Sequence, residues 1–174
     1  MTAKLPHPEP AARTVWRSPV GELLLVAGER ALLGCWFCDQ SGIPDWARQA
    51  PMQPAHPLLL EAIAQLQAYF DGRRRDFELP LDCSRGTDFQ QAVWRALAAI
   101  PCGSTVSYGQ LAQAIGRPRA VRAVGAAVGR NPLGIILPCH RVVGEDGALT
   151  GYTGGLARKT FLLQLEQAQA ALFP

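Results

Sequence analysis

Hydrophobic positions near the N-terminus fall into three short runs that predict β-strands. The runs Thr14 to Arg17, Glu22 to Ala27 and Ala31 to Phe37 are separated by Pro19-Val20-Gly21 and by Gly28-Glu29-Arg30. Proline and glycine between apolar runs end strands and form tight turns. We therefore predict a three-stranded antiparallel meander.

The hydrophobic period then changes to that of a helix. Between His56 and Tyr69, apolar side chains recur three or four residues apart, and the pattern stops at Asp71-Gly72. We expect this helix to cover one face of the sheet. The segment from Leu79 to Gly86 is rich in turn formers and predicts a connector between two domains, residues 1–83 and residues 87–174.

The second domain is predicted to be mostly helical. Thr87 with Gln90, and Ser107 with Gln110, are two capping boxes, in which the side chains of the first and fourth residues satisfy the free backbone donors of a helix start. A short helix, a glycine-proline turn and a helix from Ala120 to Val128 follow the second box. This arrangement indicates a helix-turn-helix, and its alternative is an ordinary helical hairpin packed in the core.

The second helix of this pair has an unusual composition. It carries almost only alanine, valine and glycine, with Arg122 as its one long polar side chain. Small side chains let a helix approach DNA closely but read no bases, so we interpret it as a reader of shape and backbone. The elements together predict an α+β fold: a small N-terminal antiparallel sheet with a helix, then a mostly helical domain containing the helix-turn-helix and a cysteine motif.

Composition narrows the class of protein. A hydrophobic fraction of 48% over 174 residues supports a folded core. Residues 1–10 contain no apolar stretch, and no later segment approaches the roughly 20 apolar residues that span a bilayer, so we expect a cytoplasmic protein. Five cysteines without a secretory signal favour reduced thiols over disulfides.

Charge is distributed unevenly along the chain. Residues 1–85 hold nine Lys/Arg and ten Asp/Glu, whereas residues 86–174 hold eight and four. No acidic residue lies between Phe89 and Gly144, and this interval contains Arg95, Arg117, Arg119, Arg122, Arg130 and Arg141. We expect such a run in a protein that binds phosphate backbones, although scattered surface arginines would give a similar total.

The reactive groups concentrate at Pro138-Cys139-His140-Arg141-Val142, inside an apolar run that otherwise predicts a buried strand. A lone cysteine there would be a small buried hydrophobe, but an adjacent imidazole and guanidinium are costly to bury without partners. Their presence indicates a site in which Cys139 is the nucleophile and His140 accepts its proton. The imidazole then needs a further group to orient it.

Few acidic residues can orient this imidazole. Downstream of Phe89 the chain contains Glu145, Asp146 and Glu166. The first two lie in a turn-like segment that we expect to be solvated. Glu166 lies on a predicted helix from Ala157 to Ala170, and we therefore predict it as the third member of the site.

Three weaker motifs are assigned to structure. Cys35 and Cys38 have zinc-like spacing, but on a strand they face opposite sides and no second pair accompanies them. Residues 73–75 are three arginines that suit the end of a helix, with accessory phosphate contact as the minor alternative. Residues 144–155 are glycine-rich but lack the strand-to-helix context of a phosphate loop. We predict neither a metal nor a cofactor.

Four motifs in order resemble the 6-O-alkylguanine-DNA alkyltransferases. They are Ser107-Tyr108-Gly109-Gln110-Leu111-Ala112, Asn131-Pro132, Pro138-Cys139-His140-Arg141-Val142 and Gly151-Tyr152-Thr153-Gly154-Gly155-Leu156. The resemblance is dense from about Thr87 to Glu166. It implies repair of double-stranded DNA by transfer of the alkyl group of 6-O-alkylguanine, with 4-O-alkylthymine as a further candidate, to Cys139.

The resemblance also implies how the protein works. The product is a thioether without a hydrolysable bond, so each molecule acts once. The base must be flipped, because its 6-oxygen lies in the stacked pair where a buried thiolate cannot reach it. The expected partner is duplex DNA containing alkylated guanine, with no cofactor and no membrane, and the expected state is a monomer.

Residue roles follow from the same resemblance. His140 and Glu166 would form the relay that generates the Cys139 thiolate. Arg122 would replace the extruded base in the stack, and Tyr108 would push the 3′ phosphate and donate a hydrogen bond to the leaving guanine. The remaining assignments are Asn131 bracing the turn before the cysteine, Val142, Tyr152 and Thr153 lining the base pocket, Lys159 close to the site, and Arg119 and Arg130 contacting DNA.

Some positions depart from the family pattern, and other classes of protein fit parts of the chain. Gly151 stands where other members carry asparagine, and Ala126 and Val128 stand where bulkier or more flexible residues are expected. These differences leave the size of the base pocket and the preferred alkyl group open. A helix-turn-helix regulator without chemistry would explain the basic half but not Cys139 beside a histidine. A cysteine hydrolase would explain the nucleophile but not the acid-free run.

Overall fold

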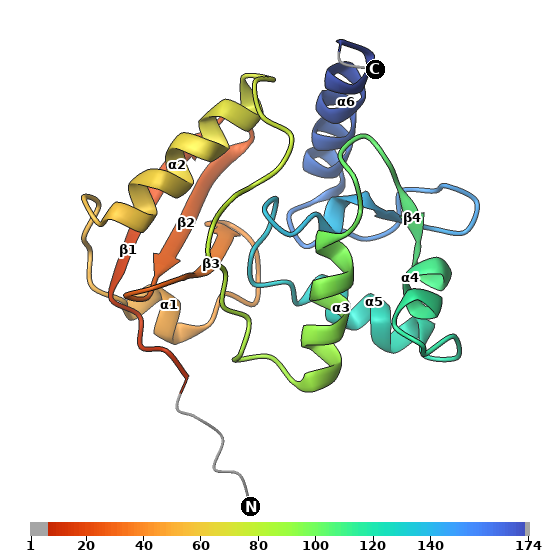
Figure 1. Cartoon of the computed structure of the whole chain (residues 1–174), viewed down its shortest axis with the longest axis horizontal. Coiled ribbons are helices and arrows are strands. Elements are labelled where there is room, and N and C mark those ends of the chain that lie inside the picture. The colour runs from red at the N-terminus through yellow and green to blue at the C-terminus, as the bar shows by residue number, and fades with distance from the viewer. Residues whose placement is uncertain (1–6, 173–174) are drawn as a thin grey trace, which may run out of the picture.

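The structure is a computed structural model that describes residues 7–172. Figure 1 shows a small sheet flanked by helices in the N-terminal part and a cluster of helices beside it in the C-terminal part. A long coil after residue 70 runs between the two parts.

The N-terminal part contains the predicted meander. Strands β1 (Ala12–Ser18), β2 (Gly21–Ala27) and β3 (Leu32–Phe37) pair antiparallel in that order. The turn between β1 and β2 is tight because Gly21 adopts a φ of 122°, a conformation that side chains disfavour. The prediction of three strands is confirmed.

Each face of the sheet is covered by a helix, because side chains alternate along the strands. Leu23 and Leu25 of β2 join a cluster with Leu59 and Leu66 of helix α2 (Pro57–Phe70). Leu24, Val26 and Trp36 pack on the opposite face with Ala47 of the short helix α1 (Asp45–Gln49). The predicted helix over one face is therefore confirmed, and the first cluster continues into the C-terminal helices.

The C-terminal part begins with the two predicted capping boxes. Thr87 caps α3 (Asp88–Ala98), and Ser107 caps α4 (Tyr108–Ala114). Helix α4 packs against α5 (Val121–Gly129) across a turn at Gly116. This pair is the helix-turn-helix, and the long helix α6 (Leu156–Leu172) completes the domain.

The expected strand around the cysteine is absent from this part of the structure, so that prediction is wrong. Residues 139–141 form a single 3₁₀ turn, η1 (Cys139–Arg141), followed by the two-residue strand β5 (Val142–Val143), which pairs parallel with β4 (Val106–Ser107). Proline at 132 and at 138 removes ladder donors, and Ile135 has a φ of 70°, which no strand allows. Hydrophobicity at 135–137 reflects burial in a turn.

This turn attaches the cysteine segment to the sheet. The amide of Cys35 on β3 donates to the carbonyl of Pro132 at 2.8 Å, and the amide of Gly134 donates to the carbonyl of Cys35 at 2.9 Å. The edge of the N-terminal sheet thus supports the loop that precedes Cys139. Within residues 7–172, no helix is long and apolar enough to cross a membrane.

Candidate active site

Cys139 lies at a cavity of about 190 Å³ between the helix-turn-helix and the loop before α6. It begins the η1 turn and is 9% exposed. The cavity is lined by Tyr108, Gly125, Val128, Gly129, Cys139, Gly151, Tyr152 and Thr153. Four separate segments of the C-terminal part therefore meet around one thiol.

Hydrogen bonds hold the mouth of this cavity together. The hydroxyl of Thr153 donates to the carbonyl of Gly129 at 2.8 Å, which ties the loop to the end of α5. The hydroxyl of Tyr108 donates to the carbonyl of Thr150 at 3.3 Å, which ties the same loop to α4. The phenols of Tyr108 and Tyr152 thus reach the cavity from two different segments, α4 and the loop before α6.

Burial dominates the electrostatics of the thiol. It raises the pKa of Cys139, whereas hydrogen bonding with Asn131 and Tyr152 and the charge of Lys159 act in the opposite direction. Burial likewise raises the pKa of Tyr152, so its phenol stays protonated and can donate to the sulfur. At neutral pH the cysteine is a thiol, so it must lose its proton if its sulfur is to act as a nucleophile.

Three predicted support residues are absent from the lining of this cavity, although Asn131 lines a smaller cavity of about 20 Å³ that also contains Cys139. Asn131 holds the turn, since its amide donates to the carbonyl of Leu137 at 2.8 Å and its carbonyl oxygen accepts from the amide of Leu133 at 2.9 Å. Lys159 is fully buried and donates to the carbonyl of Val142 at 2.6 Å. Val142 is itself fully buried and is not among the residues that line this cavity, so its predicted place in the base pocket stays a prediction.

Lys159 also reaches the loop that carries Tyr152. Its ammonium donates to the carbonyls of Thr150 and Gly151 at 3.3 Å each. With Val142 this makes three acceptors for the three donors of an ammonium group. Burial lowers the pKa of Lys159, and the cysteine acts in the opposite direction. The residue cross-links backbone on two sides of the site.

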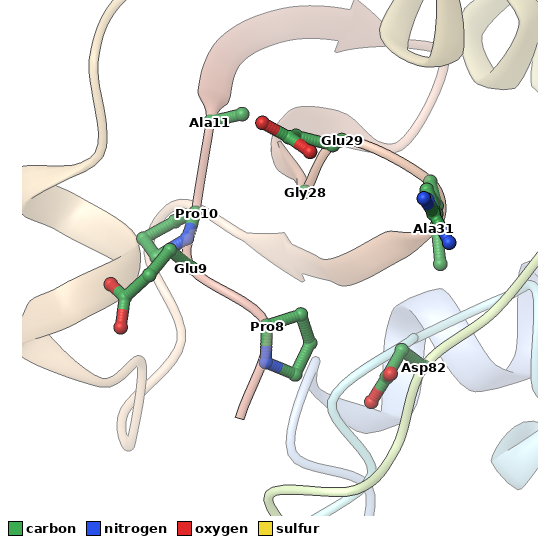
Figure 2. A pocket seen from close by; sticks show the side chains of 9 residues that line it. Pro8, Glu9, Pro10, Ala11, Gly28, Glu29, Ala31 and Asp82 are labelled. Carbon is green, nitrogen blue, oxygen red and sulfur yellow. The ribbon is translucent and has the colours of Figure 1, made fainter. Parts of the chain in front are cut away.

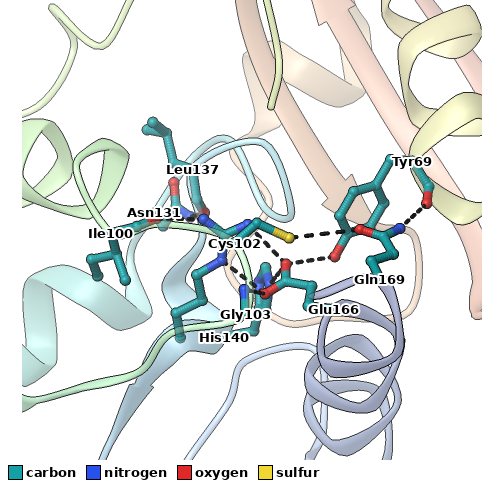
Figure 3. Close-up of polar contacts among 10 residues, drawn as sticks. Tyr69, Ile100, Cys102, Gly103, Asn131, Leu137, His140, Glu166 and Gln169 are labelled. Atoms are coloured by element: carbon teal, nitrogen blue, oxygen red, sulfur yellow. Dashed lines mark hydrogen bonds and ion pairs between the residues drawn. The ribbon is translucent and has the colours of Figure 1, made fainter. Parts of the chain in front are cut away.

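Near the cysteine, the carboxylate of Glu166 forms hydrogen bonds with groups from several segments of the chain (Figure 3). The Nε2 atom of His140 lies 2.7 Å from Oε1 of Glu166. Arg141 donates from Nε to Oε2 and from a terminal nitrogen to Oε1, both at 2.9 Å. Glu166, the predicted third member of the site, thus contacts His140. The side chains of His140, Arg141 and Glu166 are all buried.

Protonation states follow from this geometry. Burial alone would raise the pKa of Glu166, but hydrogen bonds from His140 and Arg141 lower it to about 2. Burial lowers the pKa of His140 despite the neighbouring carboxylate. The imidazole is therefore neutral at neutral pH, and Glu166 is ionised. The Nδ1 atom of His140 is buried and has no hydrogen-bond partner among residues 7–172.

Sequence reasoning missed two members of this network. Arg141 was counted among the arginines that face phosphate, but it is 5% exposed and neutralises Glu166, because a buried carboxylate needs a counter-ion. Tyr69 of α2 donates its hydroxyl to Oε1 of Glu166 at 2.8 Å. The residues around Tyr69 in the sequence predict only that it lies on the buried face of a helix. They contain no signal that links it to Glu166.

The predicted DNA-contacting arginines lie in and around α5. Arg122 is exposed on that helix, and Arg119 and Arg130 are exposed just before and after it. Gly125 and Gly129 of the same helix line the cavity. Three exposed positive charges thus lie on or next to the helix that lines part of the cavity.

The segment expected to be solvated also has a structural role. Glu145 is exposed, but its Oε1 accepts a hydrogen bond from the hydroxyl of Ser107 at 2.8 Å. This contact joins the turn at 144–147 to the start of α4, where Tyr108 begins. Among residues 7–172, the hydrogen-bonded carboxylate partner of His140 is Glu166, not Glu145.

A larger cavity of about 580 Å³ lies elsewhere, between the start of the described chain and the turn from β2 to β3 (Figure 2). It is lined by Glu9, Glu29 and Asp82, with Arg30 as its basic group. Three carboxylates repel phosphate, so this cavity does not suit a DNA strand. Among residues 7–172, no three potential ligands of His, Cys, Asp and Glu are grouped to hold a metal ion.

Comparisons with known proteins agree with this geometry. Residues 12–83 match the family described as 6-O-methylguanine DNA methyltransferase, ribonuclease-like domain, and residues 88–168 match its DNA binding domain. A methylated-DNA–protein-cysteine methyltransferase of Mycobacterium tuberculosis H37Rv is 48% identical over 153 residues, which cover 88% of this chain and 90% of the relative. The constitutive Bacillus subtilis enzyme of that name is 46% identical over 158 residues, covering 88% and 94%.

Solved structures give the same picture. The crystal structure of Mycobacterium tuberculosis OGT in complex with DNA matches with a TM-score of 0.84 and 44% sequence identity, covering 91% of this chain and 94% of that one. A structure of Mycobacterium tuberculosis O6-methylguanine methyltransferase matches with a TM-score of 0.82 and 44% identity, covering 94% and 99%. The similarity therefore includes both the sheet and the helical part.

Proposed function

We propose, because this chain belongs to the 6-O-methylguanine DNA methyltransferase family, that it repairs DNA by transferring the alkyl group of 6-O-alkylguanine to its own Cys139. The observation that carries the proposal is the position of this thiol, at a small cavity beside α5 and in front of a buried His140–Glu166 pair. Residues 1–83 support the site, and residues 87–174 bind DNA and carry the chemistry.

The proton path follows from the two pKa directions. The thiol is protonated at rest and the imidazole is neutral, so the proton passes from Cys139 to Nδ1 of His140 as the sulfur attacks. No direct hydrogen bond between these two side chains is found among the described residues, and one water molecule is a sufficient bridge. The ionised Glu166 then stabilises the imidazolium through Nε2.

The transfer step is a displacement at the alkyl carbon. A carbon–sulfur bond to Cys139 forms as the carbon–oxygen bond to guanine breaks, and the electron pair stays on the base. Tyr108, whose pKa burial raises, remains a neutral donor on the cavity wall, and its hydroxyl can exchange its long hydrogen bond to the carbonyl of Thr150 for one to the base as negative charge develops there. The base leaves as an anion and takes up one proton, which balances the proton that Cys139 gave to His140, so the products are a thioether and intact guanine.

Access to the cavity requires base flipping. A duplex base cannot enter a cavity of about 190 Å³ while it is stacked, so the nucleotide must rotate out of the helix. Arg122 is the long side chain on the exposed side of α5, and it fills the gap that the base leaves. Arg119 and Arg130 contribute phosphate contacts, whose strength falls with added salt.

The cavity also limits turnover. Its lining contains the hydroxyls of Tyr108, Tyr152 and Thr153 but no second thiol, and a thioether offers no bond that water readily hydrolyses. The reaction is therefore stoichiometric. All five cysteines are free, which suits a reducing cytoplasm, the compartment that we assign to the protein.

Transfer from labelled DNA tests this function. Duplex DNA carrying a radiolabelled 6-O-methylguanine should pass its label to the wild-type protein, up to one methyl group per molecule. Cys139→Ala should bind the same DNA, because affinity comes from the α5 side, and should take no label. DNA binding without transfer by the wild type would identify a regulator, and release of a hydrolysed product with continued turnover would identify a hydrolase.

A further inference from the structure

We propose that Tyr69 of the N-terminal part is a positioning residue for the alkyl transfer, which holds the Glu166 carboxylate in the orientation that serves His140. The inference rests on the proposed function, because it concerns the relay behind Cys139. Tyr69 lies 97 positions from Glu166 in the chain, yet its hydroxyl is 2.8 Å from Oε1, the same oxygen that His140 contacts.

The carboxylate has competing partners. Oε1 accepts from His140, Arg141 and Tyr69, whereas Oε2 accepts from Arg141 and, at 3.4 Å, from the amide of Gly103. A guanidinium is the strongest of these donors and favours both oxygens at once. Arg141 already binds both oxygens in this orientation, so it shares Oε1 with the imidazole, and a shift of the carboxylate could keep both guanidinium bonds while it lengthens the contact with His140. A second neutral donor on Oε1 opposes that shift.

Tyr69 is built to be rigid. It is fully buried, and its ring lies 5.3 Å from that of Phe70 and 5.4 Å from that of Phe77. Its carbonyl accepts a hydrogen bond from Gln169 at 2.9 Å, one turn beyond Glu166 on α6. Both ends of the residue are thus fixed to the same helix, as Figure 3 shows. Burial raises its pKa, so the phenol stays protonated and donates.

Other titratable groups surround the relay without replacing this contact. Arg141 and Lys159 act on His140 by charge, and Cys102 lies near Glu166 and bonds to Gln169 at 3.6 Å. None of these three donates a neutral hydrogen bond to Oε1. The phenol is therefore the contact that fixes this oxygen without adding charge.

The test compares Tyr69→Phe with the wild type in the reaction of Cys139 with free 6-O-benzylguanine, across the pH range on both sides of neutrality. Without the hydroxyl, the imidazolium is less stabilised, so the rate at neutral pH should fall by about tenfold, the effect of one hydrogen bond to a charged group. The pH profile should move to higher pH, and the two proteins should converge where the thiol ionises unaided.

Phe77→Leu is the matched control, since it removes packing from the same ring but no hydrogen bond. It should lower thermal stability and leave the pH profile in place. A Tyr69→Phe profile that overlays the wild type, or one lowered equally at every pH, would overturn the inference while the proposed function stands. A wild type that reacts neither with this base nor with 6-O-methylguanine in duplex DNA would overturn both.

Two further measurements test the inference, and the second needs no variant, so it applies even if Tyr69→Phe folds poorly. In a His140→Gln background, Tyr69→Phe should add no displacement of the pH profile, because its effect passes through the imidazole; an additive effect contradicts this route. In the wild type, NMR should show a protected hydroxyl proton on Tyr69 close to the Nε2 proton of His140. Absence of that proton would show that the contact does not exist in solution.

Discussion

Glu166 has two functions at the residue scale. It orients His140, and it is the counter-ion of buried Arg141. A buried cation that loses its only carboxylate partner destabilises a protein strongly. This residue therefore cannot be treated as a catalytic group that is removable without structural cost, as its sequence position alone would suggest.

The first prediction concerns this residue. Glu166→Gln should lower the free energy of unfolding by about 3–5 kcal/mol, because Arg141 keeps its charge and loses its partner. Denaturant unfolding measures the change. Glu29→Gln, at an exposed carboxylate, is the control and should change stability by less than about 0.5 kcal/mol. A similarly small loss for Glu166→Gln would contradict the buried ion pair.

The second prediction separates flipping from chemistry. Arg122 is exposed on α5 and does not line the cavity, so Arg122→Ala should slow repair of duplex DNA by at least about tenfold and leave the reaction with free 6-O-benzylguanine unchanged. Rates on the two substrates are the measurement. Arg119→Ala should mainly weaken binding and its salt dependence. Equal slowing on both substrates would refute the assigned role of Arg122.

Single residues also show where sequence reasoning ends. Cys139, His140 and Glu166 could be predicted because an imidazole in an apolar run needs partners and acidic residues are scarce downstream. Tyr69 could not, since its contact with Glu166 depends on how α2 docks against α6. Arg141 was misassigned because a sequence gives its charge but not its burial.

At the scale of elements, helix starts were predictable and the cysteine segment was not. Thr87 and Ser107 form capping boxes whose signal is local, so α3 and α4 begin where expected. Residues 135–143 were predicted as a strand because burial and β-structure give the same hydrophobic run. Asn131 satisfies the backbone there with its side chain, and this competes with a ladder.

The third prediction tests the element that carries Tyr108. Ser107 caps α4 and also donates to Glu145, so Ser107→Ala should cost about 1 kcal/mol of stability and loosen the turn at 144–147. Thr87→Ala removes an equivalent cap from α3 and should cost a similar amount. The Ser107 variant alone should react more slowly with 6-O-benzylguanine. Equal rates for the two variants would show that the cap does not support the site.

At the scale of the whole molecule, the relay ties the two parts of the chain together. Tyr69 comes from α2, Glu166 from α6 and His140 from η1, so separation of the parts dismantles the relay. The turn before Cys139 is also bonded to β3 through Cys35. The N-terminal part does not line the cavity of about 190 Å³, but its Phe37 and Gln40 line a smaller cavity of about 20 Å³ that also contains Cys139.

The fourth prediction is a pH dependence of stability. The pKa of Glu166 falls from 4.5 to about 2 on folding, so its contribution is complete above pH 4.5 and is lost as the pH drops toward 2. The pKa of His140 is also lowered from 6.5 in the folded protein, so below that pH the unfolded chain binds more protons than the folded one, which lowers the free energy of unfolding as well. The free energy of unfolding should therefore fall below about pH 6.5 and most steeply below about pH 4.5.

Denaturant titrations over this pH range provide the measurement. Glu166→Gln should show a smaller slope below about pH 4.5, since the main titrating carboxylate of the network is gone. Stability that stays constant or rises on acidification would contradict the protonation states assigned to the relay.

The central claim is that Cys139 receives the alkyl group once and keeps it. Mass spectrometry of the intact protein after incubation with excess 6-O-methylguanine duplex DNA, followed by peptide mapping, tests it most directly. We predict a persistent gain of one methyl group, located on Cys139, with no further reaction of the modified molecules. An unchanged mass, a methyl group on another of the five cysteines, or continued turnover would contradict the account.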